Sequence, residues 1–333
     1  MSLSIERAAE IMGRFPAQRV LVVGDLMLDR YLQGTVDRIS PEAPVPVVRV
    51  RSERHVPGGA SNVAWNLRAM RGGAAVCGVV GDDPEGRELR RLLRRNRVDV
   101  AVAASPGVRT SVKTRIIAER QQVCRVDRED ELCLRGAALR SLAAAAARET
   151  AGSTGVIIED YGKGVVCQSV VDAVLRAAAK AGIPCGLDPK DNHALRVKGI
   201  TLATPNRKEA FGGAQMKDPG AGPDPLQDQA LLEVGRLLLE RWAPRHLMIT
   251  LGPLGMLLLT RGEPPLHVPT RAREVFDVSG AGDTVIAVCT LALAAGADYY
   301  EAAELANYAA GVVVAKMGTA TCTPDELLAH MRE

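Results

Sequence analysis

The chain has 333 residues, of which 47% are hydrophobic and 24% charged, and its net charge is +3. This length and composition predict a large buried core in one or two domains. The small net charge and an aromatic content of only 3% argue against nucleic acid as a partner, because nucleic-acid-binding proteins rely on basic surfaces and aromatic stacking platforms.

The sequence gives no sign of secretion or of membrane insertion. The N-terminus lacks the charged-then-apolar pattern of a signal peptide, and no apolar run is long enough to cross a bilayer. The seven cysteines are scattered and form no C-x-x-C pair, which is typical of reduced thiols rather than of a disulfide framework or a zinc site. We therefore expect a cytoplasmic protein with no membrane partner.

Short apolar strands alternate with helical patterns along most of the chain. The strands are predicted at residues 19–23, 75–80, 155–158, 185–187 and 246–251. The helices are predicted at residues 4–13, 61–71, 86–96, 137–149, 169–181, 228–241, 284–295 and 300–316, with a short last helix after Pro324. Continuous apolar strands separated by helices predict an α/β fold with a mostly parallel sheet covered on both faces. We expect one such domain over residues 1–333.

Two segments, 31–56 and 108–128, do not follow this rhythm. Both alternate apolar and polar residues, and the first also contains three prolines. Such alternation predicts short antiparallel strands with one exposed face, which would pair as a small sheet outside the main one. This sheet would be either a flap over a binding site or a peripheral addition, and alternation alone does not choose between them. Residues 214–227 are rich in Gly, Pro and Asp and predict a surface loop.

A small-residue stretch precedes the predicted helix at 284–295. It reads DVSGAGDT at residues 277–284. Gly280, Ala281 and Gly282 allow backbone N–H groups to turn toward an anion, and a helix N-terminus adds unpaired donors. Asp283, placed beside such a site, is a candidate general base for phosphoryl transfer. The alternative is that Asp283 only caps the helix or charges its first turn.

Two earlier stretches carry groups suited to sugar hydroxyls. Gly58 and Gly59 permit close backbone approach, and Asn62 offers both a donor and an acceptor. Asp29 follows the first strand, where ligands bind in open α/β sheets, and its carboxylate can accept hydrogen bonds from two neighbouring hydroxyls. A plain turn and an ordinary loop acid remain the alternatives.

Two later stretches suit a nucleotide. Asn206 and Glu209 are three residues apart, so on a helical turn they share one face and can hold water around Mg²⁺. The sequence TLGPLG at 250–255 leaves a strand with little side-chain bulk, as the phosphates of a nucleotide require, although such turns are common. The chain contains neither a P-loop nor a dinucleotide-binding glycine motif.

The stretches PGGASNVA at 57–64 and DVSGAGDTVIAV at 277–288 together resemble the two signatures of the ribokinase-like, or phosphofructokinase-B-type, sugar kinases. The intervening pattern extends the resemblance over nearly the whole chain. It implies a ribokinase-like α/β domain with a small β-sheet lid over the sugar, ATP as donor, and Mg²⁺. It also implies that Asp283 acts as base beside a backbone anion hole at Gly280, Ala281 and Gly282.

Further stretches resemble the D-glycero-β-D-manno-heptose-7-phosphate kinases. They are VVGDLMLDRY at 22–31, DRISPEAPVPV at 37–47, residues 115–127, DYGKG at 160–164 and LDPK at 187–190. This resemblance implies phosphorylation of the anomeric hydroxyl of heptose 7-phosphate, for ADP-heptose and the lipopolysaccharide core. Many members also carry an adenylyltransferase domain. The chain contains no H-x-G-H motif, so we expect no adenylyltransferase domain and only the kinase step.

The resemblance also assigns roles to residues. It implies that the acceptor is held by Asp29, Gly58, Gly59 and Asn62, with Asp160 and Lys163 facing the site. It places Mg²⁺ and the nucleotide at Asn206, Glu209 (which would hold the metal indirectly, through water), Thr250, Gly252, Gly255 and Asn307. The 7-phosphate needs cations, and the candidates are Arg38, Lys190 and one of Arg115, Arg120 and Arg125, each of which could instead be a solvated surface residue.

Three points stay open at the level of the sequence. Another sugar or nucleoside kinase of the same fold would show the same motifs, because fold alone does not choose the substrate. A non-catalytic, sugar-responsive binding protein is an alternative of a different class. A monovalent cation is possible as a further cofactor. The exposed edges of the lid strands favour a homodimer formed through the lids.

Overall fold

A computed structural model describes residues 3–105, 107–119, 121–130, 132–191 and 193–332. The strands are β1 (Arg19–Gly24), β2 (Leu26–Ile39), β3 (Pro46–Gly59), β4 (Gly73–Gly81), β5 (Asp99–Ser105), β6 (Ser111–Ala118), β7 (Gln121–Arg128), β8 (Gly155–Glu159), β9 (Cys185–Asp188), β10 (Leu202–Ala203), β11 (His246–Thr250), β12 (Met256–Thr260) and β13 (Leu266–Val268). The helices are α1 (Ile5–Gly13), α2 (Ala60–Ala69), α3 (Pro84–Arg95), α4 (Gly136–Ala151), α5 (Gln168–Ala181), α6 (Arg207–Ala214), α7 (Gln229–Arg241), α8 (Ala281–Ala294), α9 (Tyr299–Val314) and α10 (Pro324–Arg332), with 3₁₀ turns at Phe15–Ala17 and Gly252–Leu254.

The central sheet has the strand order β13-β12-β11-β10-β9-β8-β1-β4-β5. All neighbouring strands from β11 to β5 are parallel, whereas β12 and β13 are antiparallel to the strands beside them. The prediction of a mostly parallel sheet is therefore confirmed. Its inner strands are buried along their length, which explains why they read as continuous apolar runs rather than as alternating ones.

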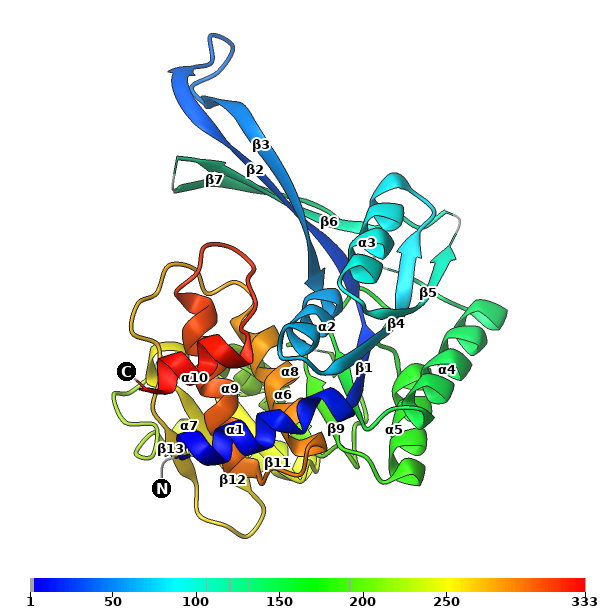
Figure 1. The fold of residues 1–333 in the computed structure, drawn as a ribbon, viewed down its shortest axis with the longest axis vertical. Coiled ribbons are helices and arrows are strands. Elements are labelled where there is room, and N and C mark those ends of the chain that lie inside the picture. Colours follow the sequence, from blue (N-terminus) through cyan, green and yellow to red (C-terminus); the bar gives the residue numbers. More distant parts are fainter. Residues whose placement is uncertain (1–2, 106, 120, 131, 192, 333) are drawn as a thin grey trace.

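Helices cover the two faces of this sheet in two separate apolar clusters. One face packs against α1, α2, α3, α8, α9 and α10, and the other against α4, α5, α6 and α7. Figure 1 shows α8 and α9 side by side on the first face, with α2 close to α8. None of the helices within the described ranges is both long enough and apolar enough to cross a membrane. All seven cysteines are free thiols, as expected.

The two alternating segments form a separate four-stranded sheet of order β3-β2-β6-β7, which we call the lid. The prediction of a small sheet outside the main one is confirmed, but the prediction of short antiparallel strands is wrong in two respects. Strands β2 and β3 form a hairpin of 14 residues each, and the two segments join through the parallel pair β2–β6. The hairpin projects well beyond the helices in Figure 1.

The lid begins directly beside the carboxyl end of β1. Strand β2 starts at Leu26, so Asp29 lies on a lid strand and not in a loop after the first strand, as the sequence suggested. Gly58 and Gly59 end β3 and lead straight into α2, and Asn62 lies in the first turn of α2. One hairpin thus brings the predicted acceptor residues to the same edge of the sheet.

Candidate active site

Helix α8 begins at this edge, and its first turn carries Asp283, which is buried with 6% of its surface exposed. Gly280 precedes the helix with φ = +82°, and a Cβ at this position would lie 2.8 Å from the side-chain nitrogen of Asn62. Only glycine adopts this conformation without strain and leaves room for Asn62. The N–H of Ala281 donates to the carbonyl of Val278 (3.2 Å), so Ala281 contributes small size rather than a free donor at this helix start.

Both carboxylate oxygens of Asp283 accept hydrogen bonds. The Nδ2 of Asn62 donates to Oδ2 at 2.6 Å, and the hydroxyl of Tyr161 donates to Oδ1 at 2.8 Å. Burial raises the pKa of Asp283, and these two hydrogen bonds oppose that rise. Asn62 therefore contacts the predicted base itself, which connects the two glycine-rich stretches in space.

Tyr161 comes from the loop after β8, and that loop is held by a buried acid. The carboxylate of Asp25 accepts the backbone N–H groups of Tyr161 (3.0 Å), Lys163 (2.9 Å) and Val165 (3.0 Å). Asp25 is 2% exposed, so it acts on the loop and not on solvent. Sequence reasoning gave roles to neither Asp25 nor Tyr161, because nothing in their spacing links them to residue 283.

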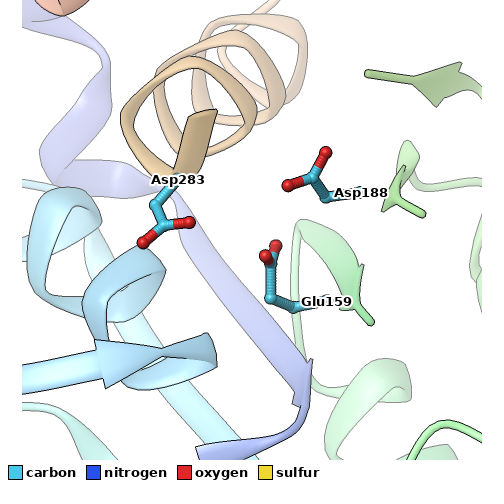
Figure 2. A group of neighbouring side chains, drawn as sticks. All are labelled: Glu159, Asp188 and Asp283. Atoms are coloured by element: carbon cyan, nitrogen blue, oxygen red, sulfur yellow. The ribbon is translucent and has the colours of Figure 1, made fainter. Parts of the chain in front are cut away.

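Three carboxylates converge below α8. Glu159 ends β8, Asp188 ends β9, and each offers an oxygen within 4.8 Å of the others and of Asp283. Figure 2 shows the three side chains pointing toward one another from separate elements. Neither oxygen of the fully buried Glu159 accepts a hydrogen bond from a described residue. Burial first, and then the neighbouring negative charges, raise the pKa of Glu159 and of Asp188.

Asn206 and Glu209 lie next to this cluster and form the capping box of α6. The Oδ1 of Asn206 accepts the N–H of Glu209 (3.0 Å), and Oε2 of Glu209 accepts the N–H of Asn206 (2.9 Å). Burial raises the pKa of Glu209, while the Asn206 N–H and the positive charge of Lys190 act in the opposite direction. The two residues thus have a structural role, and the Glu209 charge also raises the pKa of Asp188.

An all-oxygen group of this kind fits a hard divalent cation. Carboxylates and water are the ligands that Mg²⁺ takes in proteins, and it keeps several of its waters. Asp283 already uses both oxygens for Asn62 and Tyr161, whereas Glu159 has no donor partner among the described residues. Glu159 and Asp188 are therefore the members of the group best placed to hold a cation, with Glu209 behind them.

A mainly apolar cavity of about 350 Å³ lies on the other side of the α8 N-terminus. Its lining includes Thr250, Gly252, Gly255 and Asn307, which are the four residues predicted for the nucleotide besides Asn206 and Glu209. Ala281 and Gly282 of α8 also line it. The amide of Asn307 donates to the carbonyl of Pro269 at 2.7 Å. The cavity has the size and the apolar walls that a planar base requires.

On the lid side, Asp29 is buried and bound at both oxygens. The Nη1 of Arg115 donates to Oδ1 (2.7 Å), and Oγ1 of Thr319 donates to Oδ2 (3.2 Å). A Cβ at Gly58 would lie 2.9 Å from Oδ2 of Asp29, so this glycine makes room for the carboxylate. Asp29, Gly58 and Asn62 therefore lie at the same edge of the sheet as Asp283, and their contact with a sugar stays a prediction.

Among the described residues, the arginines predicted to bind the 7-phosphate lie at different distances from Asp29. Arg38 is exposed and lies far along β2 from Asp29, about 30 Å at 3.3 Å per residue, so it does not join the acceptor residues of its own chain. Arg125 is exposed and pairs with Asp127 (2.9 Å), and Arg120 lies outside the described residues. Arg115 faces the site, because it binds Asp29.

Asp160 and Lys163, which were predicted to face the acceptor, contact other residues of the chain, and so does Lys190. The carboxylate of Asp160 contacts Nδ1 of His193 at 2.5 Å, and the ammonium of Lys163 contacts Glu129 at 2.5 Å. Lys190 is exposed and lies 3.4 Å from Asp191. Contact of these three residues with a ligand remains a prediction.

Lys113 is a further cation that sequence reasoning did not single out. It lies on β6 opposite Asp29, is partly buried, and its ammonium lies 5.2 Å from the ring centre of Tyr161. Burial lowers its pKa, and no carboxylate of the described residues lies within ion-pair distance. The signal that could have found Lys113 is the alternation itself, since residues 113 and 115 share a face of β6.

Comparison with known proteins places the chain in a family. The profile of the pfkB family carbohydrate kinases matches residues 17–326. Curated relatives named "Bifunctional protein HldE" are 46% identical over 327 residues in Caulobacter sp. (strain K31) and 42% identical over 319 residues in Pelobacter propionicus. These alignments cover 97% and 96% of this chain, but only 65% and 64% of the relatives' own lengths.

Solved structures show the same fold. A putative ribokinase from Agrobacterium tumefaciens superposes with a TM-score of 0.74 at 23% identity, covering 95% of this chain and 97% of the other. The phosphofructokinase-2 of Escherichia coli in complex with potassium has a TM-score of 0.75 at 20% identity, covering 95% and 99%. The fold is therefore ribokinase-like, and with its glycine-rich helix start, its buried acid and its family match, this chain belongs to the pfkB family of carbohydrate kinases.

Proposed function

We propose that this kinase uses MgATP to phosphorylate the anomeric hydroxyl of D-glycero-D-manno-heptose 7-phosphate, giving the 1,7-bisphosphate for ADP-heptose and lipopolysaccharide core synthesis in the cytoplasm. The observation that carries the proposal is the position of Asp283. Its carboxylate contacts Asn62, which lies in the first turn of α2 directly after the lid strand β3, while Ala281 and Gly282, its neighbours in α8, line the apolar cavity. A base located between an acceptor side and a nucleotide side is what phosphoryl transfer requires.

In the proposed reaction, Asp283 takes the proton of the acceptor hydroxyl as its oxygen attacks the γ-phosphorus of ATP. The new O–P bond forms while the bond from the γ-phosphorus to the β,γ-bridging oxygen breaks, and ADP leaves with the electron pair. The helix N-terminus at Gly280–Gly282 stabilises the charge that spreads over the transferring group. Each oxygen of Asp283 retains a lone pair beyond the bonds from Asn62 and Tyr161, so one is available for the proton.

Mg²⁺ is the cation we propose for the carboxylate group. Glu159 and Asp188 would hold it, with Glu209 acting through water, and the bound ion would supply charge neutralisation at the phosphates. The buried Glu159 oxygens, which lack a donor among the described residues, support this assignment. The apolar cavity lined by Thr250, Gly255 and Asn307 would take the adenine.

For the 7-phosphate, the geometry favours Lys113 over the cations predicted from the sequence. Lys113 and Arg115 share the inner face of the lid with Asp29, and Lys113 has no carboxylate partner among the described residues. An unpaired, partly buried ammonium gains most from an incoming phosphate. Lys190 remains a second candidate, although its effect on Glu209 suits the phosphates of ATP equally well.

A coupled ADP-release assay tests the acceptor. We expect the highest kcat/KM with heptose 7-phosphate among a panel that also contains unphosphorylated heptose, ribose, fructose 6-phosphate and adenosine. Lys113→Gln should raise KM for the phosphorylated heptose by at least tenfold, since a charge-assisted contact is lost, and should change KM for the unphosphorylated sugar little. Lys180→Gln, on the exposed end of α5, is the matched control.

The alternatives give different outcomes in the same assay. Preference for ribose, fructose 6-phosphate or adenosine would replace heptose by another acceptor within the family. An equal effect of Lys113→Gln on both heptoses would remove this residue from phosphate binding. If ATP binds but no acceptor of the panel leads to ADP release, a binding protein would be favoured over an enzyme of this substrate class.

We also propose that two copies associate through their lids. The lid exposes Ile39 (61%), Val45 (51%), Val50 (49%), Val123 (39%) and Val126 (55%), a set of apolar side chains that a second copy would cover. Light scattering at working concentration should give the mass of a dimer, and Val50→Asp combined with Val126→Asp should give a monomer. A monomeric wild-type protein would contradict the proposal.

A further inference from the structure

Tyr161 contacts the predicted base and is supported on several sides. Its hydroxyl donates to Oδ1 of Asp283 at 2.8 Å, and its backbone N–H donates to Asp25. The ammonium of Lys113 lies over its ring, 5.2 Å from the centre. Burial, and then the charge of Asp283, raise the pKa of the Tyr161 phenol, so the hydroxyl keeps its proton and acts as a donor.

The second oxygen of the base is fixed from the opposite direction. Asn62 donates to Oδ2, and Asn62 itself is held because Nδ2 of Asn66 donates to its backbone carbonyl (3.0 Å). The hydroxyl of Thr284 in turn donates to Oδ1 of Asn66 at 2.9 Å. The Asn62 side is therefore anchored within α2 and α8, and among the described residues of the loop after β8 it is Tyr161 that donates to Asp283.

A carboxylate with one donor can rotate about its Cβ–Cγ bond, whereas two donors on different oxygens define its plane. The need for such a restraint is greater here because Glu159 and Asp188 lie within 4.8 Å and repel the Asp283 charge. A donor on Oδ1 offsets this repulsion and keeps the plane of the carboxylate constant. Neither the family match nor the resemblance in sequence gives Tyr161 a role.

We propose that Tyr161 is a positioning residue for the base: its hydroxyl holds Oδ1 of Asp283 so that the carboxylate presents a free lone pair to the acceptor hydroxyl. The proposal rests on the proposed role of Asp283 as base. Tyr161 acts through Asp283 and need not touch either substrate. Its removal should therefore slow the chemical step and leave substrate binding almost unchanged.

Kinetics of Tyr161→Phe test this role. We expect kcat to fall about 10- to 100-fold, as for loss of a hydrogen bond to a charged group, with KM for ATP and for the acceptor within about threefold of wild type. In an Asp283→Asn background the same substitution should change the residual rate by less than about threefold, because groups that act as a unit are not additive. Tyr300→Phe, which removes a phenol that donates to Glu304 (3.3 Å), should retain the wild-type kcat.

The contact between Tyr161 and Asp283 can also be tested without measuring kinase activity. The chain has five tyrosines, so ¹⁹F NMR of protein labelled with 3-fluorotyrosine should give few resonances, and the one lost in Tyr161→Phe identifies residue 161. That resonance should shift in Asp283→Asn, and the resonance assigned in the same way to Tyr300 should not. Thermal unfolding and ATP binding show whether each variant folds.

The outcomes separate this inference from the proposed function. An unshifted Tyr161 resonance, or an equal loss of rate in the wild-type and Asp283→Asn backgrounds, would overturn the positioning role. A higher acceptor KM at unchanged kcat would make Tyr161 a binding residue instead. A wild-type protein that releases no ADP with any acceptor would reject the proposed function, while the NMR result would still decide the contact.

Discussion

Asp283→Asn should lower kcat by about 10²–10⁴-fold, the usual contribution of a general base, while ATP still binds and the protein stays folded. The amide is nearly isosteric, and its single oxygen can still accept the hydroxyl hydrogen of Tyr161, so the helix start should keep its shape although the Asn62 side chain loses its acceptor. It cannot take the proton of the acceptor. Isothermal titration with ATP and thermal unfolding measure binding and folding separately from the coupled assay.

The position of Asp283 makes the result decisive. The carboxylate is buried, and in the described part of the chain it is the acid that lies both beside the α8 N-terminus and against Asn62. Near-normal turnover in the variant would remove Asp283 from the base role. As a matched control, Asp228→Asn changes an acid that caps α7 by accepting the N–H of Leu231 (3.0 Å), and it should reduce stability rather than kcat.

Glu159→Gln should raise the melting temperature of the protein at pH 8 when no divalent cation is present. The wild-type Glu159 carboxyl is fully buried and close to Asp188 and Asp283, so burial and like charge raise its pKa. A raised acid pKa means that the folded state binds more protons than the unfolded state. Stability is therefore lost as pH rises above the ordinary glutamate range and through the raised value.

The neutral amide in Glu159→Gln does not ionise, so it removes this loss of stability at high pH. We expect the melting temperature of wild type to fall between pH 5 and pH 8 and that of Glu159→Gln to fall less, with roughly 2–4 °C of difference for each kcal/mol of relief. Mg²⁺ should raise the melting temperature of wild type more than that of the variant, because the variant lacks one of the proposed ligands. Glu240→Gln, an exposed acid on α7, is the control, and an equal pH slope in wild type and Glu159→Gln would contradict the expectation.

Much of the fold follows from the sequence because the main strands are buried on both sides. Strands β1, β4, β8, β9 and β11 read as continuous apolar runs, and the helices between them have a regular apolar spacing. Strands β5, β10, β12 and β13 and the short helix α6 were not predicted. Strand β10 has two residues and α6 has eight, so neither is long enough to show a period.

The base of the lid was missed for a different reason. All four residues of β2 at Leu26–Asp29 are buried, and this strand packs against α2, α3 and β4. Its alternation therefore begins only farther along, where one face becomes exposed. The sequence predicted the exposed part of the hairpin and placed Asp29 in a loop, although the residue is a strand residue at the site.

The candidate site was predictable where a motif keeps its chemistry within a few residues. Gly280–Asp283 and Gly58–Asn62 are of this kind, and the structure brings them into contact. Tyr161, Lys113, Glu159 and Asp188 belong to the site through the order of strands in the sheet, which no local pattern encodes. Arg38 shows the converse, since a cation in a matching stretch lies far from the other acceptor residues along β2.

The bond between Asp29 and Thr319 has a consequence for the synthesis of the chain. The two residues are 290 positions apart, so at roughly 5–20 residues per second about 15–60 s pass between the emergence of the first and of the second. Once residue 128 has been made, the four lid strands are complete, but the Thr319 hydroxyl that binds Asp29 does not yet exist. Kinase activity should therefore appear abruptly, after the last helices are made, and a nascent chain stalled before Thr319 should have an ordered hairpin and no turnover.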